Sequence, residues 1–117
     1  MKDSIYDIYA SEFQLAVEEQ CKRNRGLFDA LTKHGCASSR LARAVTKSVT
    51  QCRCTGIAGD GTSTGELCPD CRETIEDEIG EELFFLAVIA NNLGLSLYDI
   101  LIKERNKMGI LGKYSLK

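Results

Sequence analysis

The stretch CRCTGIAGDGTSTGELCPDC, residues 52–71, holds a C-x-C pair and a C-x-x-C pair of cysteines separated by thirteen residues. Structural zinc sites are tetrahedral, and cysteine thiolates bind zinc at about 2.3 Å. Glycine is frequent between the two pairs, so this segment can fold back and bring all four sulfur atoms to one ion. The sequence therefore predicts a zinc site formed by Cys52, Cys54, Cys68 and Cys71. Four sulfur ligands leave no position open for water, which indicates a structural role.

The residues between the two cysteine pairs are mostly glycine, serine and threonine. A segment of this composition cannot form a hydrophobic core of its own. We therefore expect residues 51–71 to be an inserted metal-binding loop that the metal fastens at both ends. Cys68 and Cys71 lie where a helix is predicted to begin, and the helix dipole favours a thiolate at that end.

The same cysteines allow three other interpretations. CPDC, residues 68–71, is similar to the C-P-x-C motif of thioredoxin-type redox enzymes, but that motif belongs to a β-α-β setting, which is not predicted here. A zinc ribbon could bind nucleic acid through the basic residues of 22–53. Because no β-hairpin is predicted and aromatic residues do not alternate with the basic ones, we do not expect nucleic-acid binding. The thiols could also cluster without binding a metal.

On both sides of this loop, apolar residues recur every three or four positions, which is typical of helices. The pattern predicts helices over about 4–33, 39–50, 69–92 and 96–108. Gly35 and Gly94 are expected to end the first and third helices. Pro69 suits a first helical turn, and Ser96 with Asp99 forms a start similar to a capping box.

No strand is predicted, and the connections between the helices are short apart from the cysteine loop. Short connections favour antiparallel neighbours. We therefore expect an all-α fold, an antiparallel four-helix bundle with the cysteine-rich zinc loop between helices 2 and 3. This bundle is expected to form a single domain over residues 1–117.

The chain of 117 residues contains no candidate membrane span. Its longest apolar run, residues 83–90, is far shorter than the roughly 20 residues that a spanning helix needs. Residues 1–13 lack the apolar core of a secretory signal. We therefore expect a cytoplasmic protein that does not bind membranes. Disulfides are rare in that reducing compartment, so clustered cysteines there more often bind metal or perform redox chemistry.

The net charge is −2, but basic residues dominate 22–53 and acidic residues dominate 66–82. The two segments either form solvated faces that attract each other or face one site from opposite sides. Glu78, Glu81 and Glu82 share one side of a predicted helix, where they could hold Mg²⁺ or complement the helix dipole. His34 is expected near a helix end rather than as a metal ligand.

The segment EIGEELFFLAVIANNLGLSLYDIL, residues 78–101, combines an acidic pair, a buried apolar run, a Leu-Gly break and an amphipathic helix. In these features it resembles the closing half of the MazG-like, all-α nucleoside triphosphate pyrophosphatase superfamily. The resemblance implies an oligomeric helical bundle that hydrolyses nucleoside triphosphates to monophosphate and pyrophosphate with Mg²⁺. It implies that Glu78 and Glu81 are catalytic and bind Mg²⁺, with Glu81 replacing the usual aspartate of an E-x-x-D pair.

The other acidic pair of that superfamily, E-E-x-x-E, is missing from the preceding helix. Residues 38–51 contain no acidic residue and instead offer Arg40, Arg43 and Lys47. These cations could pair with the carboxylates in place of the metal, or could bind the phosphates of a nucleotide.

Two functions therefore stay open. One is a zinc-stabilised ligand-binding, regulatory or assembly module without robust hydrolysis. The other is a divergent Mg²⁺-dependent nucleotide pyrophosphohydrolase. In both cases the third helix is apolar nearly all round beyond residue 83, which predicts a homodimer.

Overall fold

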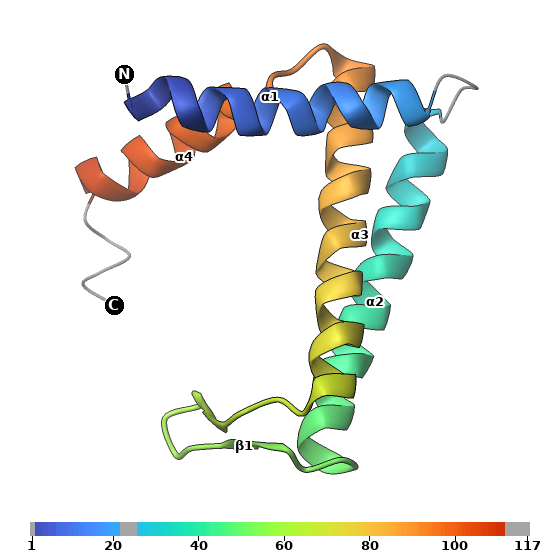
Figure 1. The fold of residues 1–117 in the computed structure, drawn as a ribbon, viewed down its shortest axis with the longest axis vertical. Helices are drawn as coiled ribbons and strands as arrows, with labels where there is room; N and C mark the ends of the chain where they lie inside the picture. The colour runs from blue at the N-terminus through green and yellow to red at the C-terminus, as the bar shows by residue number, and fades with distance from the viewer. Residues whose placement is uncertain (1, 22–25, 112–117) are drawn as a thin grey trace. The chain divides into compact units, whose positions relative to one another are not determined.

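The computed structural model describes residues 2–21 and 26–111. They form α1 (Lys2–Gln20), α2 (Leu27–Thr50), β1 (Thr55–Ile57), β2 (Ser63–Gly65), α3 (Pro69–Leu93) and α4 (Leu97–Leu111), as Figure 1 shows. The prediction of a mostly helical chain with a cysteine cluster between the second and third helices is confirmed. No single helix within the described ranges is long and apolar enough to span a membrane. Only α3 and α4 taken together pass that test, and they are bent by 107°.

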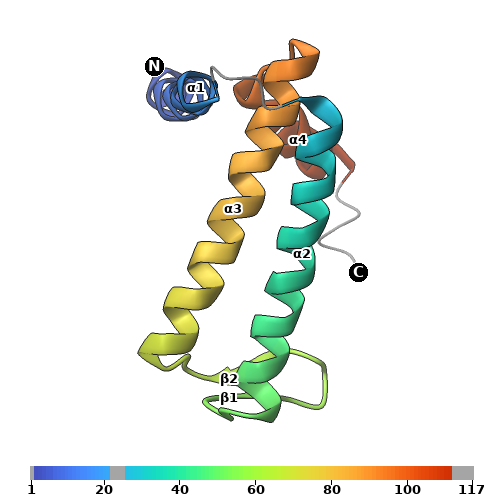
Figure 2. The same cartoon turned by 90° about the vertical axis from the view of Figure 1, so that its right-hand side faces the viewer.

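The described chain divides into two compact units, of which one is Leu31–Phe85. This unit contains most of α2, the first part of α3 and the segment that joins them. Its two helices lie side by side and antiparallel, with the β-strands at one end (Figures 1 and 2). Its buried side chains include Ala37 and Ser48 on α2 and Phe85 on α3. Both buried side chains on α2 are small, whereas the one on α3 is a large aromatic ring.

The boundary between the first two helices differs from the prediction. α1 ends at Gln20, and α2 runs from Leu27 through Gly35 to Thr50; residues 22–25 of the expected first helix lie outside the described residues. A glycine inside a helix costs only about 1 kcal/mol relative to alanine. His34 and Arg40, which flank this part of α2, both contact α3. These tertiary contacts override the local stop signal at Gly35.

A short β-hairpin lies inside the cysteine loop, where no strand is predicted. The two strands pair antiparallel, with Thr55 opposite Gly65. The amide of Ala58 donates to the carbonyl oxygen of Thr62 at 2.8 Å and closes the turn. Inside the turn, the Asp60 carboxylate accepts from the hydroxyl of Thr62 at 2.7 Å and from its amide at 3.0 Å, which lowers the pKa of Asp60. Three-residue strands without alternating apolar residues carry no periodic signal, which explains why they are missed.

The second unit contains α1, the part of α3 from Leu86 onward and α4. Gln14 of α1 joins it to the α3–α4 corner. Its Nε2 donates to Asn91 Oδ1 at 2.8 Å and to the carbonyl oxygen of Leu95 at 2.6 Å. Its Oε1 accepts from the amide of Leu97 at 2.8 Å. Asn91 Nδ2 donates back to the carbonyl oxygen of Gln14 at 3.2 Å, so two side-chain amides interlock α1 with the corner.

The predicted end of α3 and start of α4 are confirmed. Gly94 has a φ of 69°, and the amide of Leu95 donates to the carbonyl oxygen of Ala90 at 2.9 Å. This geometry closes a helix through a left-handed glycine. Ser96 Oγ then accepts from the amide of Asp99 at 3.2 Å, which caps α4.

Candidate metal centre

The first cysteine pair follows the last turn of α2. The carbonyl oxygen of Lys47 accepts from the amides of Gln51 at 3.0 Å and Cys52 at 2.9 Å, so helical bonding extends to Cys52. Arg53 then adopts a φ of 63°, in the left-handed region, and is the single non-glycine residue of the described chain that does so. This left-handed residue lies between Cys52 and Cys54, whose sulfur atoms both belong to the same cluster.

The second pair forms the N-terminus of α3. The carbonyl oxygen of Cys68 accepts from the amide of Arg72 at 2.9 Å, which makes Cys68 the N-cap residue. Its Sγ accepts from the amide of Cys71 at 3.4 Å, the role that a serine or aspartate oxygen usually fills. Pro69 occupies the first helical position, where its missing N–H is not needed. Both cysteines of the second pair are therefore fixed within the first turn of α3.

The structure brings the four predicted cysteines together. All four Sγ atoms lie within 4.8 Å of one another, and Cys52 Sγ lies 3.7 Å from Cys68 Sγ. In a tetrahedral zinc site with bonds of about 2.3 Å, neighbouring sulfur atoms are about 3.8 Å apart. The cluster is therefore compatible with zinc, and small side-chain shifts would bring every pair to this spacing.

The thiols influence one another's ionisation. The backbone N–H of Cys68 lowers the pKa of Cys54 to about 7. Hydrogen bonding with the Cys68 thiol raises the pKa of Cys71 to about 12 and also raises the pKa of Cys52. Neighbouring thiolates repel each other, so four sulfur atoms this close cannot all ionise without a cation between them. A dication supplies the missing charge and deprotonates its ligands.

The acidic cluster on α3 contacts Arg40 and His34 of α2. Arg40 Nε donates to Glu78 Oε1 at 3.0 Å, and Arg40 Nη2 donates to Glu81 Oε1 at 3.1 Å. The hydrogen bond to Glu78 raises the pKa of Arg40 further above its usual value. His34 Nε2 lies 3.3 Å from Glu82 Oε1. A guanidinium therefore lies against the two carboxylates that the family resemblance assigns to Mg²⁺.

The other two predicted phosphate-binding residues do not join this cluster. Arg43 and Lys47 are exposed, and neither forms an ion pair with another residue of the described ranges. The contacts of His34 with Glu82 and of Gln14 with Asn91 are not predicted from the sequence. For His34, the neighbouring Gly35 suggests a helix end. For Gln14, a polar residue on a helix carries no sequence signal that identifies a partner far along the chain.

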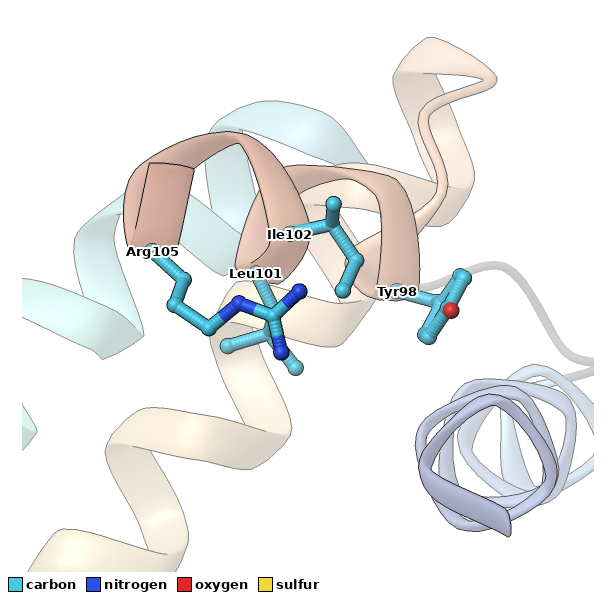
Figure 3. A pocket seen from close by; sticks show the side chains of 4 residues that line it. All are labelled: Tyr98, Leu101, Ile102 and Arg105. Carbon is cyan, nitrogen blue, oxygen red and sulfur yellow. The ribbon is translucent and has the colours of Figure 1, made fainter. Parts of the chain in front are cut away.

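A separate pocket of about 420 Å³ lies along α4. Its described lining consists of Tyr98, Leu101, Ile102 and Arg105, which Figure 3 shows as sticks. This lining offers no carboxylate, thiol or imidazole, so these residues provide no metal-ligand set.

Comparison with protein-family models gives no match, and neither does a search of curated proteins or of solved structures. The MazG-like resemblance therefore stays a prediction from the motif in residues 78–101.

Proposed function

We propose that this protein is a zinc-stabilised, MazG-like helical module that binds a ligand or partner or supports an assembly, without robust nucleotide hydrolysis. The observation that carries this proposal is the double contact of Arg40 with Glu78 and Glu81. Mg²⁺ needs near-octahedral oxygen coordination. A guanidinium held by both carboxylates competes with the ion for the same oxygen atoms and leaves less negative charge to attract it.

The zinc ion has a structural role in this proposal. Cys52 and Cys54 follow α2, whereas Cys68 and Cys71 begin α3, so one ion would tie the adjoining ends of both helices together. The β-hairpin between the two pairs would be closed at its base by the same ion. We expect one zinc ion per chain, and a cytoplasmic location keeps the thiols reduced and able to bind it.

The homodimer expected from the sequence is proposed to form through α2 and α3. Leu31 and Val45 on α2, and Ile79 and Leu83 on α3, are 43–52% exposed, although they belong to one two-helix unit. A second α2–α3 pair would cover such side chains. In a two-fold arrangement the exposed basic residues of one α2 can face the acidic α3 of the partner, so the charges favour self-association.

One experiment tests the absence of robust hydrolysis. The purified protein is incubated with a panel of nucleoside triphosphates and Mg²⁺, and pyrophosphate release is measured. We expect no release above that of a heat-inactivated sample. Turnover that Glu78→Gln abolishes and Glu12→Ala leaves unchanged would contradict the proposal, because Glu12 is an exposed residue of α1 outside the cluster.

A divergent pyrophosphohydrolase is the second candidate. It is favoured by the gathering of Glu78, Glu81 and Glu82 opposite Arg40 and His34 of α2. In this candidate Arg40 leaves the carboxylates to bind a phosphate together with Arg43 and Lys47, and Mg²⁺ takes its place. Mg²⁺-dependent binding of a non-hydrolysable triphosphate that weakens in Arg43→Ala would support this candidate.

A further inference from the structure

We propose that the four-cysteine centre is a peroxide-sensitive switch, in which oxidation joins Cys52 to Cys68 and releases the zinc ion. This inference rests on the proposed zinc site and assigns a regulation to it. It differs from a thioredoxin-like reaction, which would join Cys68 to Cys71 within one helix start.

Access and distance select the reacting pair. Cys52 is exposed, whereas the other three cysteines of the cluster are half-buried, so a dissolved oxidant reaches Cys52 first. Within a cluster whose sulfur atoms all lie within 4.8 Å of one another, the Sγ atoms of Cys52 and Cys68 are 3.7 Å apart, within hydrogen-bonding distance. The second step therefore needs only a short approach of two side chains.

The reaction balances with hydrogen peroxide as the oxidant. The Cys52 thiolate attacks one peroxide oxygen, the O–O bond breaks, and a sulfenic acid and hydroxide form. The Cys68 thiolate then attacks the Cys52 sulfur and displaces a second hydroxide, which leaves an S–S bond. Two protons convert the hydroxides to water, so one peroxide accepts the two electrons that the thiolates lose. Cys54 and Cys71 alone provide too few ligands to retain the ion.

The chain connection gives this disulfide a distinct consequence. Cys52 follows α2 and Cys68 precedes α3, with the β-hairpin between them. A Cys52–Cys68 bond therefore keeps the hairpin closed and the two helix ends joined after zinc has left. A Cys68–Cys71 bond would leave α2 and the first cysteine pair unattached. Oxidation would thus replace the zinc link between the two helix ends by a disulfide and expose Cys54 and Cys71.

The sequence allows direct mapping of the bond. Cleavage after Arg53 and Arg72 by trypsin, and before Asp60 and Asp70 by endoproteinase Asp-N, places each of the four cysteines in a different peptide. These peptides are residues 48–53, 54–59, 60–69 and 70–72. Mass spectrometry of the digested protein, after free thiols have been alkylated, then identifies the bonded pair without any cysteine variant.

The test treats zinc-loaded protein with increasing hydrogen peroxide and follows zinc release with a chromophoric chelator. We expect one zinc ion released per disulfide formed, a cross-link between peptides 48–53 and 60–69, and recovery of zinc binding after a thiol reductant. Cys36→Ser is the matched control, because Cys36 is exposed but outside the cluster, and it should release zinc at the same peroxide concentration.

Two outcomes overturn the switch. One is a main product that joins Cys68 to Cys71, and the other is zinc retained when peroxide is in large excess. A reduced protein that binds no zinc at all would instead overturn the metal site of the proposed function. Thermal unfolding adds a further check, since oxidised zinc-free protein should unfold at a higher temperature than reduced zinc-free protein. Equal unfolding temperatures contradict the closed oxidised hairpin.

Discussion

Gly65 provides the sharpest test of the geometry at the metal centre. Its φ is 77°, and a Cβ added there would lie 3.2 Å from the carbonyl oxygen of Cys54. Alanine in the left-handed region costs about 1–2 kcal/mol, and the close backbone oxygen adds to this cost. We expect Gly65→Ala to destabilise the closed hairpin by about 2 kcal/mol. Because the hairpin has no core and should fold with the metal, zinc affinity should fall by about 30-fold.

Alanine variants of two other glycines in the same loop distinguish the effect of backbone strain from that of the close contact with the Cys54 oxygen. Gly59 has neither a left-handed φ nor an atom within 4 Å of an added Cβ, so Gly59→Ala should leave zinc affinity within about twofold. Gly61 has a φ of 91° but nothing within 4 Å. Gly61→Ala should therefore show the strain alone and weaken binding by about tenfold. Competition titration against a chromophoric chelator measures all three affinities under the same conditions.

The ranking of the three variants by zinc affinity tests whether backbone geometry at each glycine sets the affinity. Equal zinc affinity in Gly65→Ala and Gly59→Ala would refute the reasoning from backbone geometry. A similar loss in all three variants would mean that general loop flexibility sets the affinity. Gly65→Asn offers a rescue, because asparagine tolerates the left-handed region better than alanine and should recover part of the affinity.

The other predictions concern the remaining contacts. Zinc affinity should fall as the pH is lowered from 8 to 6, because protons compete with zinc for the thiolates. Cys54, whose pKa is about 7, also becomes protonated below that pH. Chelator competition at each pH measures the affinity. Leu83→Glu should convert the proposed dimer to a monomer in sedimentation, whereas the control Ile57→Glu on the hairpin should leave it dimeric. A parent protein that sediments as a monomer would contradict the dimer. Gln14→Ala should lower the free energy of unfolding by about 2 kcal/mol, measured by urea denaturation. The substitution removes three hydrogen bonds of about 1 kcal/mol each, and the one to Leu95 is exposed and contributes little. An unchanged urea midpoint would contradict the role of Gln14 in joining α1 to the α3–α4 corner.

Several features of the fold could be predicted because their causes are local. The spacing of the cysteine pairs, Pro69 at the start of α3, Gly94 at its end and Ser96 at the start of α4 each act within a few residues. Such signals depend on backbone angles and on nearby hydrogen bonds, which a short stretch of sequence already contains.

Other features depend on partners far along the chain. Gly35 carries the local signal of a helix end, but α2 continues through it because His34 and Arg40 contact α3. The acidic cluster is equally suited to a metal ion or to cations of α2, and its own spacing does not choose between them. The pairing of Glu78 and Glu81 with Arg40 appears only when α2 and α3 lie side by side.

The sequence by itself determined which atoms could bind a metal, since two close cysteine pairs at this interval supply four thiolates of the kind that zinc binds. Only the tertiary structure decided that these sulfur atoms meet and that Arg40 lies against the predicted magnesium ligands. The reason is physical. Ligand chemistry belongs to individual side chains, whereas the choice of partner depends on how distant helices pack.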